Sequence, residues 1–413
     1  MMVLDPILWD LPEQPGSNLS WAEMYWDWPA RDSTIKTILQ VANSRLEADA
    51  SGKVHPLGKS FGKLPSPQFY SRNSLPPEIL TMVFEFIGDW ELAQTVGIYT
   101  NLLPPAEWVP HLPTADKPGS LEYTILTSPF SEIRNAFSST KPKTLSDLAT
   151  KLVFKFSMTQ LLTYLSVEQK DIFWTSFGLA LLPHRASVQF NKPAILDWWL
   201  KSPAIIKKDY GPEAMDGASR MGFVPVLDWW LNSGLPLLYT ERALEAASAR
   251  GHIEVLEWWK RAAEIRSKTD HPIKLKVGKS VVGAAQSGRA SALEWWDKSG
   301  IAYGHEDGVA RLASAHGHVD ALQKWYDLKD GKIVFDNQVL VGATKNGHAD
   351  VLEWWKQSGL RVEYKTCDIE EAMEDSTVGG DLEEKVRLWW ERNGLNLGVG
   401  TNEWMKVKCL TSE

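Results

Sequence analysis

Adjacent tryptophans recur along the second half of this chain at nearly constant spacing. Six Trp-Trp pairs and one Lys-Trp variant follow one another, and their second members lie 29 to 37 residues apart. These second members are Trp199, Trp230, Trp259, Trp296, Trp325, Trp355 and Trp390. Self-similarity at a period of this length is the signature of a chain built from stacked structural repeats. Each such unit leaves an apolar face that only a neighbouring unit can cover, which excludes an ordinary globular core for this region.

Within one unit the apolar side chains predict an amphipathic helix. At about 100° per residue, Val255, Leu256 and Trp259 share one arc, and the charged residues around them fall on the other side. Trp259 lies near the middle of the apolar arc and Trp258 at its edge. We therefore expect the second tryptophan of each pair to be core and more buried than the first. The first members are expected to be half exposed at most: Trp198, Trp229, Trp258, Trp295 and Trp354.

Glycines mark the two ends of each helix pair. One set follows a stretch of small residues and suits the left-handed position that closes a first helix. This set is Gly222, Gly251, Gly288, Gly317 and Gly347. A second set ends the tryptophan helix and precedes an apolar residue, as in a Schellman close. Its members are Gly234, Gly300, Gly359 and Gly394. Each unit is therefore predicted to be helix, turn, helix and loop, and the fold class to be all-α.

The segment from Gly347-His348 to Ser358-Gly359-Leu360 resembles the second helix of an ankyrin repeat, with a tryptophan pair in place of paired leucines. Gly251-His252 and Gly317-His318 carry the same resemblance, in a divergent form that we associate with fungi. It covers residues 183–397, about seven repeats, and implies an ankyrin-like helical-repeat solenoid behind an N-terminal irregular and helical module. The usual Thr-Pro-Leu-His opening is absent, so regular β-hairpin fingers are not implied.

A second resemblance lies ahead of the repeats. The stretch SLPPEILTMVFEFIG (74–88) has the proline-led amphipathic pattern of an F-box opening. That family docks a Skp-type adaptor of a cullin-type ubiquitin ligase, so the resemblance implies that role for the matching positions. These are Leu75, Pro76, Ile79, Leu80, Val83 and Phe84. The alternative is a helical hairpin with a purely structural role.

The pattern divides the chain into five predicted parts. Residues 1–73 form a largely irregular region and linker, with one helix expected over 32–48 and a linker over 51–69. Residues 74–110 are the F-box-like hairpin, and 111–182 are a helical bridge. The repeats follow over 183–397, and 398–413 form a C-terminal tail.

The sequence offers no catalytic or metal-binding constellation. Phosphate-loop, nucleophile-elbow and His-Glu-x-x-His motifs are absent, and the two cysteines, Cys367 and Cys409, cannot form a multi-cysteine zinc site. His252, His318 and His348 recur at one repeat position without a second ligand, so a structural role is favoured over a metal site. We therefore expect a protein without enzyme activity, cofactor or metal.

Charge and hydropathy narrow the classes of partner and location. The formal net charge of −8 argues against a general nucleic-acid binder, whose affinity rests on neutralising phosphates. The chain has no apolar run long enough to span a membrane, and its N-terminus lacks the basic region of a secretory signal. The expected location is cytoplasmic or nuclear. Residues 260–289 are strongly basic and 363–385 strongly acidic, so either segment could steer a charged protein partner.

These features together predict a non-catalytic protein-protein interaction scaffold. The ankyrin resemblance places partner contacts just before each first-helix glycine, where residues vary while the framework repeats. The predicted groove residues are Gln189, Phe190, Arg220, Met221, Arg250, Gln286, Ser287, His316, Lys345 and Asn346. Three roles remain open: a substrate receptor of a cullin-type ubiquitin ligase, a scaffold with no ubiquitin link, and a glycan or single-strand binder that uses exposed tryptophans.

Overall fold

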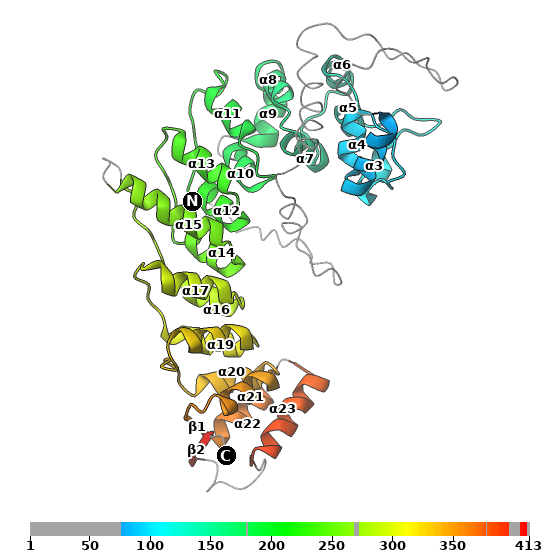
Figure 1. Ribbon diagram of the computed structural model, residues 1–413. Coiled ribbons are helices and arrows are strands. Elements are labelled where there is room, and N and C mark those ends of the chain that lie inside the picture. The colour runs from blue at the N-terminus through cyan, green and yellow to red at the C-terminus, as the bar shows by residue number, and fades with distance from the viewer. Residues whose placement is uncertain (1–75, 179–180, 268–271, 377, 396–404, 411–413) are drawn as a thin grey trace, which may run out of the picture. The chain divides into compact units, whose positions relative to one another are not determined.

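A computed structural model describes residues 76–178, 181–267, 272–376, 378–395 and 405–410 (Figure 1). The chain divides into two compact units, Met1–Lys141 and Pro142–Glu413, and the division falls inside the predicted bridge. Secondary structure in the described residues is almost entirely helical, which confirms the all-α expectation. The helix expected over 32–48, the linker over 51–69 and Leu75 lie outside these residues.

The described part of the first unit is a helical hairpin followed by three short helices. Its elements are α3 (Pro77–Ile87), α4 (Trp90–Val96), the 3₁₀-helix η2 (Ala106–His111), α5 (Leu121–Thr127) and α6 (Phe130–Thr140). Gly88 ends α3 in the left-handed conformation, and the Asp89 side chain caps α4 by accepting a hydrogen bond from the Leu92 N–H. Phe84, Ala93 and Val96 form the buried centre of the hairpin.

The second unit begins with three helices and continues as a series of helix pairs. The first three are α7 (Asp147–Lys155), α8 (Thr159–Glu168) and α9 (Lys170–Phe177). The pairs are α10 (Leu181–Val188) with α11 (Ala194–Lys201), α12 (Glu213–Met221) with α13 (Val224–Asn232), α14 (Arg242–Arg250) with α15 (Ile253–Arg266), α16 (Ser280–Gln286) with α17 (Ala290–Ser299), α18 (Asp307–Ala315) with α19 (Val319–Leu328), α20 (Gln338–Lys345) with α21 (Ala349–Gln357), and α22 (Thr366–Glu374) with α23 (Asp381–Arg392).

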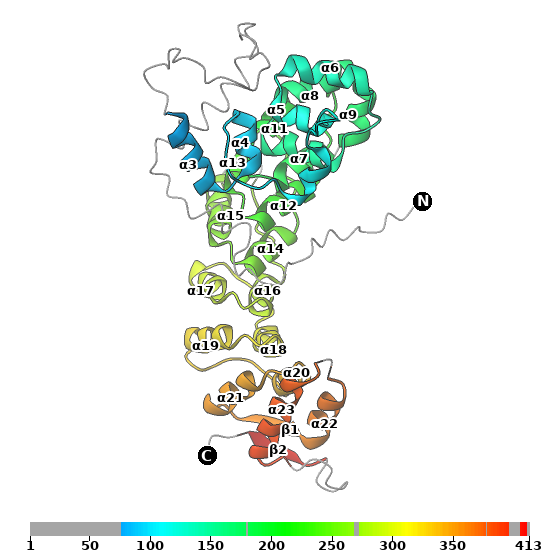
Figure 2. The ribbon, with the colours of Figure 1, turned by 90° about the vertical axis from the view of Figure 1, so that its right-hand side faces the viewer.

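The pairs stack so that first helices pack on first helices and second helices on second helices. Consecutive members from α10 to α22 are in contact, and so are consecutive members from α13 to α23. Figure 2 shows α12, α14, α16, α18 and α20 in one column and α15, α17, α19 and α21 in the column beside it. Equivalent positions of successive units therefore lie next to one another along the series.

Small residues allow the first helices to pack closely. The position four residues before each first-helix glycine is alanine and fully buried, at Ala218, Ala247, Ala284, Ala313 and Ala343. The second helices contribute a buried Leu in every unit from Leu227 to Leu352. Small side chains on one column leave room for the large ones on the other to pack between the columns.

The glycines close the helices as the sequence predicts. All nine have positive φ, between 67° at Gly288 and 83° at Gly394. The clearest case is Gly288, where φ is 67° and an added Cβ would lie 2.6 Å from the His318 ring of the next unit. This position therefore requires glycine both for backbone conformation and for contact between neighbouring units.

The loops between pairs are irregular, with one exception. Strand β1 (Val362–Lys365) follows the α21 helix and pairs antiparallel with β2 (Val407–Leu410), in a register that places Val362 opposite Leu410. Several other loops instead place an aromatic ring against the buried tryptophan of a neighbouring helix, as Tyr239 does against Trp259, with ring centroids 4.7 Å apart.

Candidate functional site

The second tryptophans form one buried row, which we call the inner indole row. All seven are at most 1% exposed, as the helical arc predicts: Trp199, Trp230, Trp259, Trp296, Trp325, Trp355 and Trp390. Five indole N–H groups donate to a hydroxyl on the first helix of the preceding unit, over 2.9 to 3.0 Å. These bonds join Trp230 to Ser187, Trp259 to Ser219, Trp296 to Ser248, Trp355 to Ser314, and Trp390 to Thr344. The row is therefore core with its polar atoms satisfied.

Two tryptophans of this row, Trp325 and Trp199, do not donate to a hydroxyl of a preceding helix. Ala285 occupies the hydroxyl position ahead of Trp325, so that unit supplies no side-chain acceptor there. Trp199 belongs to the first pair, and its buried Nε1 has no hydrogen-bond partner. The hydroxyl acceptor therefore belongs to the preceding helix pair, and each of these hydrogen bonds joins two neighbouring units.

The first tryptophans form a second row, which we call the outer indole row. Each donates its indole N–H to an acceptor of the preceding unit or helix, over 2.6 to 3.1 Å. The bonds join Trp198 to Thr163, Trp229 to Asp197, Trp258 to Asp228, Trp295 to Glu257, Trp354 to Gln323, and Trp389 to Glu353. Except for Thr163, every acceptor directly precedes the aromatic pair of its own unit.

The first tryptophans, which were expected to be half exposed at most, divide into two groups. Trp198, Trp229 and Trp295 are half-buried. Trp258 is only 4% exposed and Trp354 only 9%. A single-helix projection places both at the edge of the arc, but contact with the adjacent unit covers them. None of the paired tryptophans is exposed, so these rings present no ladder of free faces for sugars or bases.

The repeated histidines contact the turn of the preceding unit. His252 Nε2 lies 3.0 Å from the Arg220 carbonyl oxygen, and His318 Nε2 lies 2.9 Å from that of Gln286. His318 covers Gly288 in the same way that His252 covers Gly222. Burial lowers the pKa of His252, a change opposed by the bond to the Arg220 carbonyl and assisted by Arg250. This geometry gives these histidines a structural role.

The predicted groove residues lie at the helix turns, at the ends of the first helices. Arg220, Arg250, Gln286, His316 and Phe190 are exposed, and the others are half-buried: Gln189, Met221, Ser287, Lys345 and Asn346. Because consecutive first helices pack side by side, these positions follow one another from unit to unit. We call these ten residues together with Arg289 the turn strip.

Arg289 is a member of this strip that the sequence pattern did not indicate. It stands one residue after Gly288, where three other units have histidine, and its side-chain carbons lie over Gly251 of the preceding unit. Its Nε donates to the Ala249 carbonyl oxygen over 3.4 Å. The guanidinium is thereby held beside the end of α14. The substitution of Arg for His at a repeated position was the one available signal.

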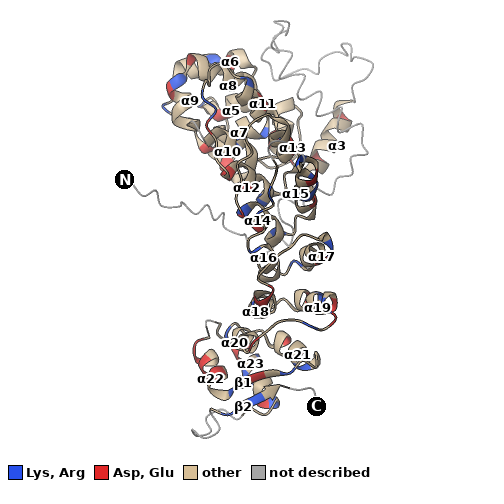
Figure 3. Cartoon of the chain, turned by 90° about the vertical axis from the view of Figure 1, so that its left-hand side faces the viewer, with Lys and Arg blue, Asp and Glu red and all other residues tan. Residues whose placement is uncertain are grey.

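Three arginines make the centre of the turn strip positively charged. Arg220, Arg250 and Arg289 form no ion pair with a carboxylate of the described residues. Partial burial lowers the pKa of Arg250, and the positive charges of Arg220 and Arg289 lower it further. Toward the C-terminal end the charge is compensated, because Lys345 pairs with Asp375 over 3.2 Å. Figure 3 shows this contrast between basic residues on α14 and acidic residues on α22.

The F-box-like positions are divided between the interior and the surface of the hairpin. Phe84 is 1% exposed and belongs to the hairpin core, and Leu80 and Val83 pack against that core. Pro76 and Ile79 are exposed. The sequence pattern missed Met82, which is 65% exposed and lies one helical turn from Ile79. We call Ile79 and Met82 the α3 apolar face.

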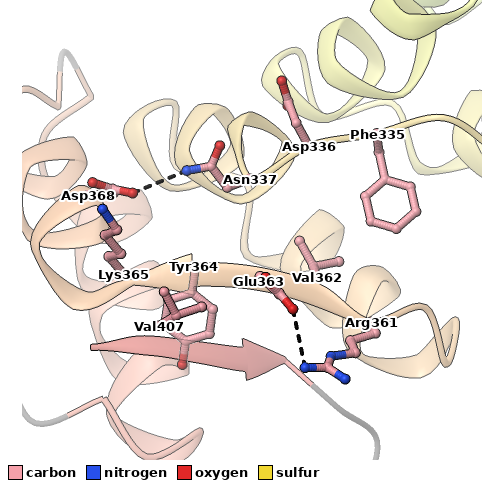
Figure 4. A pocket seen from close by; sticks show the side chains of 10 residues that line it. All are labelled: Phe335, Asp336, Asn337, Arg361, Val362, Glu363, Tyr364, Lys365, Asp368 and Val407. Atoms are coloured by element: carbon pink, nitrogen blue, oxygen red, sulfur yellow. Dashed lines mark hydrogen bonds and ion pairs between the residues drawn. The ribbon is translucent and has the colours of Figure 1, made fainter. Parts of the chain in front are cut away.

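A shallow cavity of about 450 Å³ lies where the loop before α20 approaches β1 and β2 (Figure 4). Its polar groups bond to one another: Asn337 donates to Asp368 over 3.1 Å, and Arg361 pairs with Glu363 over 3.2 Å. Tyr364 and Val407 supply apolar walls. The first of these bonds joins the start of α20 to α22, and the cavity lining presents no nucleophile next to a base.

Metal-ligand clusters, membrane-spanning helices and similarity to known proteins give little further information about function. Over the described ranges, no three metal-ligating side chains gather in one place, and no helix has the length and apolar character to cross a membrane. No model of a known protein family matches the chain, and no curated protein sequence matches it either. The turn strip and the α3 apolar face are therefore the two candidate binding surfaces among the described residues.

Proposed function

We propose that this chain is a non-catalytic recognition protein whose paired helices form an ankyrin-like solenoid that binds a partner protein along the turn strip. The supporting observation is the contrast between the two sides of each unit. The indole rows use the same residue types and the same bonds in successive units, as their structural role requires. The turn strip changes from unit to unit and carries exposed side chains such as Arg220 and Gln286, which form no side-chain hydrogen bond or ion pair with another described unit.

A rigid scaffold with variable side chains in register is well suited to recognition. Repeats of this kind bind through extended surfaces assembled from equivalent positions of neighbouring units. Because buried indole N–H groups bond five units to the first helix of the unit before, the spacing of the strip is fixed before a partner arrives. Pre-organisation of this kind reduces the entropy lost on binding.

Site-specific photo-cross-linking in the full chain tests this role. A photo-reactive amino acid replaces Gln286 in the turn strip, and a control chain carries it at Gln357, an exposed glutamine at the end of α21. In extract, we expect defined protein cross-links at position 286 and not at 357. Equal labelling at both positions, or none at 286, contradicts the proposal.

A second proposal concerns the α3 apolar face. Exposed Ile79 and Met82 on a short hairpin are the features that would let α3 dock a Skp-type adaptor, and the chain would then act as a substrate receptor of a cullin-type ubiquitin ligase. The chain purified from its native cell should then carry a near-stoichiometric adaptor, and Ile79→Arg or Met82→Arg should remove it. An intact complex in both variants, or no adaptor at all, leaves a scaffold without a ubiquitin link.

The glycan or single-strand alternative requires exposed indole faces, and the paired tryptophans offer none. Titration with a panel of oligosaccharides and single-stranded oligonucleotides addresses it directly. Intrinsic fluorescence should not change if the indoles are core. A saturable change that persists in Trp229→Phe would show binding elsewhere, whereas one abolished by that substitution would favour the aromatic-ladder role.

A further inference from the structure

The arginine group at the centre of the turn strip holds three positive charges near one another. Arg220, Arg250 and Arg289 lie on three successive units. None of them pairs with a described carboxylate, although the whole chain carries 52 acidic and 44 basic side chains. Like charges held close together destabilise a fold, and such a departure from local consistency is typical of a functional surface.

The surroundings of this group define one kind of ligand. Phe190 is 37% exposed at the preceding unit, and Met221 is half-buried between it and Arg250, whose Nη1 lies 3.8 Å from the Met221 sulfur. Gln286 and Ser287 add neutral hydrogen-bonding groups beyond the arginines. Between Phe190 and Ser287 the strip therefore passes from an apolar residue, through three guanidinium groups, to neutral polar groups.

The spacing of the units predicts the spacing of acidic residues along an extended ligand. Packed helices lie about 8–10 Å apart, and an extended chain advances about 3.3 Å per residue. One unit of the stack thus corresponds to about three residues of an extended segment. Carboxylates at every third position of such a segment would meet successive arginines, each of which can bind a carboxylate with two parallel hydrogen bonds.

We propose that the turn strip binds an extended acidic polypeptide segment that carries acidic residues at every third position and an apolar residue at one end. This inference rests on the proposed recognition function and specifies the partner's chemistry. A protein segment is favoured over a nucleic acid because only the centre of the strip is basic, in a chain of net charge −8. Polynucleotide binding is therefore an outcome that the test must separate.

Peptide binding to the full chain, followed by fluorescence anisotropy, tests the proposal. The probe is fluorescein-labelled Leu-Ser-Glu-Gly-Ser-Glu-Gly-Ser-Glu-Gly-Ser-Leu. Its isomer Leu-Ser-Gly-Ser-Glu-Glu-Glu-Gly-Ser-Gly-Ser-Leu has the same composition and charge but clustered glutamates. We expect the spaced peptide to bind about fivefold or more tightly than the isomer, and its affinity to fall as salt is raised.

Substitutions in the strip assign the binding to these residues. Each of Arg220→Gln, Arg250→Gln and Arg289→Gln should weaken the spaced peptide about three- to tenfold, a range consistent with the net loss of one ordinary hydrogen bond at an exposed position. Arg242→Gln is the matched control, because it lies on α14 at the opposite end from Arg250 and is also exposed. It should leave the affinity unchanged, and circular dichroism should show all four variants folded.

Three results would overturn the inference. In the first, the spaced peptide does not bind at about 1 mM protein. In the second, both isomers bind with equal affinity and the three strip substitutions have no effect. In the third, a single-stranded RNA of the same length binds equally tightly and its binding depends on the arginines. The failure of this inference can be told apart from the failure of the proposed recognition function. A cross-link at position 286 to a partner whose bound segment lacks acidic residues would retain the recognition role and remove only the acidic ligand.

Discussion

The indole rows and the turn strip occupy the same helix pairs and follow opposite rules. In the rows, each unit repeats its neighbour: a buried ring donates to a hydroxyl, and an outer ring donates to a carboxylate or amide. In the strip, side chains differ between units, and several form no ion pair with another described residue. The comparison indicates that the residues repeated in every unit hold the units together. The residues that vary between units are the ones available to a ligand.

The largest expected change in unfolding free energy comes from removing a tryptophan of the inner indole row, and it should exceed the change for the outer indole row. Trp259→Ala removes a ring that is 1% exposed, so the unfolding free energy should fall by about 3–5 kcal/mol. Trp229→Ala removes a half-buried ring and should cost less than half as much. Urea unfolding monitored by circular dichroism measures both. Equal losses would erase the distinction between the rows.

Removal of one hydroxyl tests the bonds between units. Ser248→Ala leaves the buried Trp296 N–H without its acceptor, which should cost about 1–3 kcal/mol. Ala285→Ser is the complementary change, because it supplies the hydroxyl that one unit lacks, and a gain of about 0.5–1.5 kcal/mol is expected. A loss of stability in Ala285→Ser would show that the hydroxyl is not a transferable part of the unit.

The covered histidines should make the stack sensitive to mild acid. Burial lowers the pKa of His252 and of His318 in the folded chain, so the unfolded chain binds more protons below its ordinary histidine pKa. Their contribution is complete above about pH 6.5 and is lost as the pH falls toward their folded-state pKa. The urea midpoint should therefore drop between pH 7.5 and 5.5. The double variant His252→Gln and His318→Gln should show a flatter response, and an unchanged slope would contradict the role given to these rings.

The smallest effect on stability is expected in the strip itself. Arg250→Gln relieves repulsion from Arg220 and Arg289 and removes a contact with the Met221 sulfur. The net change in unfolding free energy should lie within about 0.5 kcal/mol of zero. A loss several times larger would place Arg250 in the framework.

Much of the framework could be predicted from one helix at a time. The arc that contains Val255 and Trp259 gave the buried ring, and the glycine after a run of small residues gave the turn. The hydroxyl acceptors were missed because Ser219 and Trp259 are 40 residues apart, and only the stacking of units brings them together. The covering of Trp258 and Trp354 was missed for the same reason, since a projection of one helix omits its neighbours.

The candidate sites show a similar limit. The turn strip was located by its place before each glycine, but Arg289 follows its glycine and joins the strip only because it spans to the preceding unit. On α3 the apolar residues cover more than one face. The pattern could not tell which face the hairpin core would take, so Phe84 was assigned to docking although it is buried, and exposed Met82 was overlooked.

Hydrogen exchange of the indole N–H groups tests the division between framework and strip most directly. The full chain, labelled with ¹⁵N at tryptophan indoles, is transferred to deuterated buffer with and without the spaced acidic peptide. The resonances of Trp230, Trp259, Trp296, Trp355 and Trp390 should persist until the stack opens and should not shift when peptide binds. Exchange within minutes, or peptide-induced shifts of these resonances, would show that the rings are displayed for binding and would contradict the account.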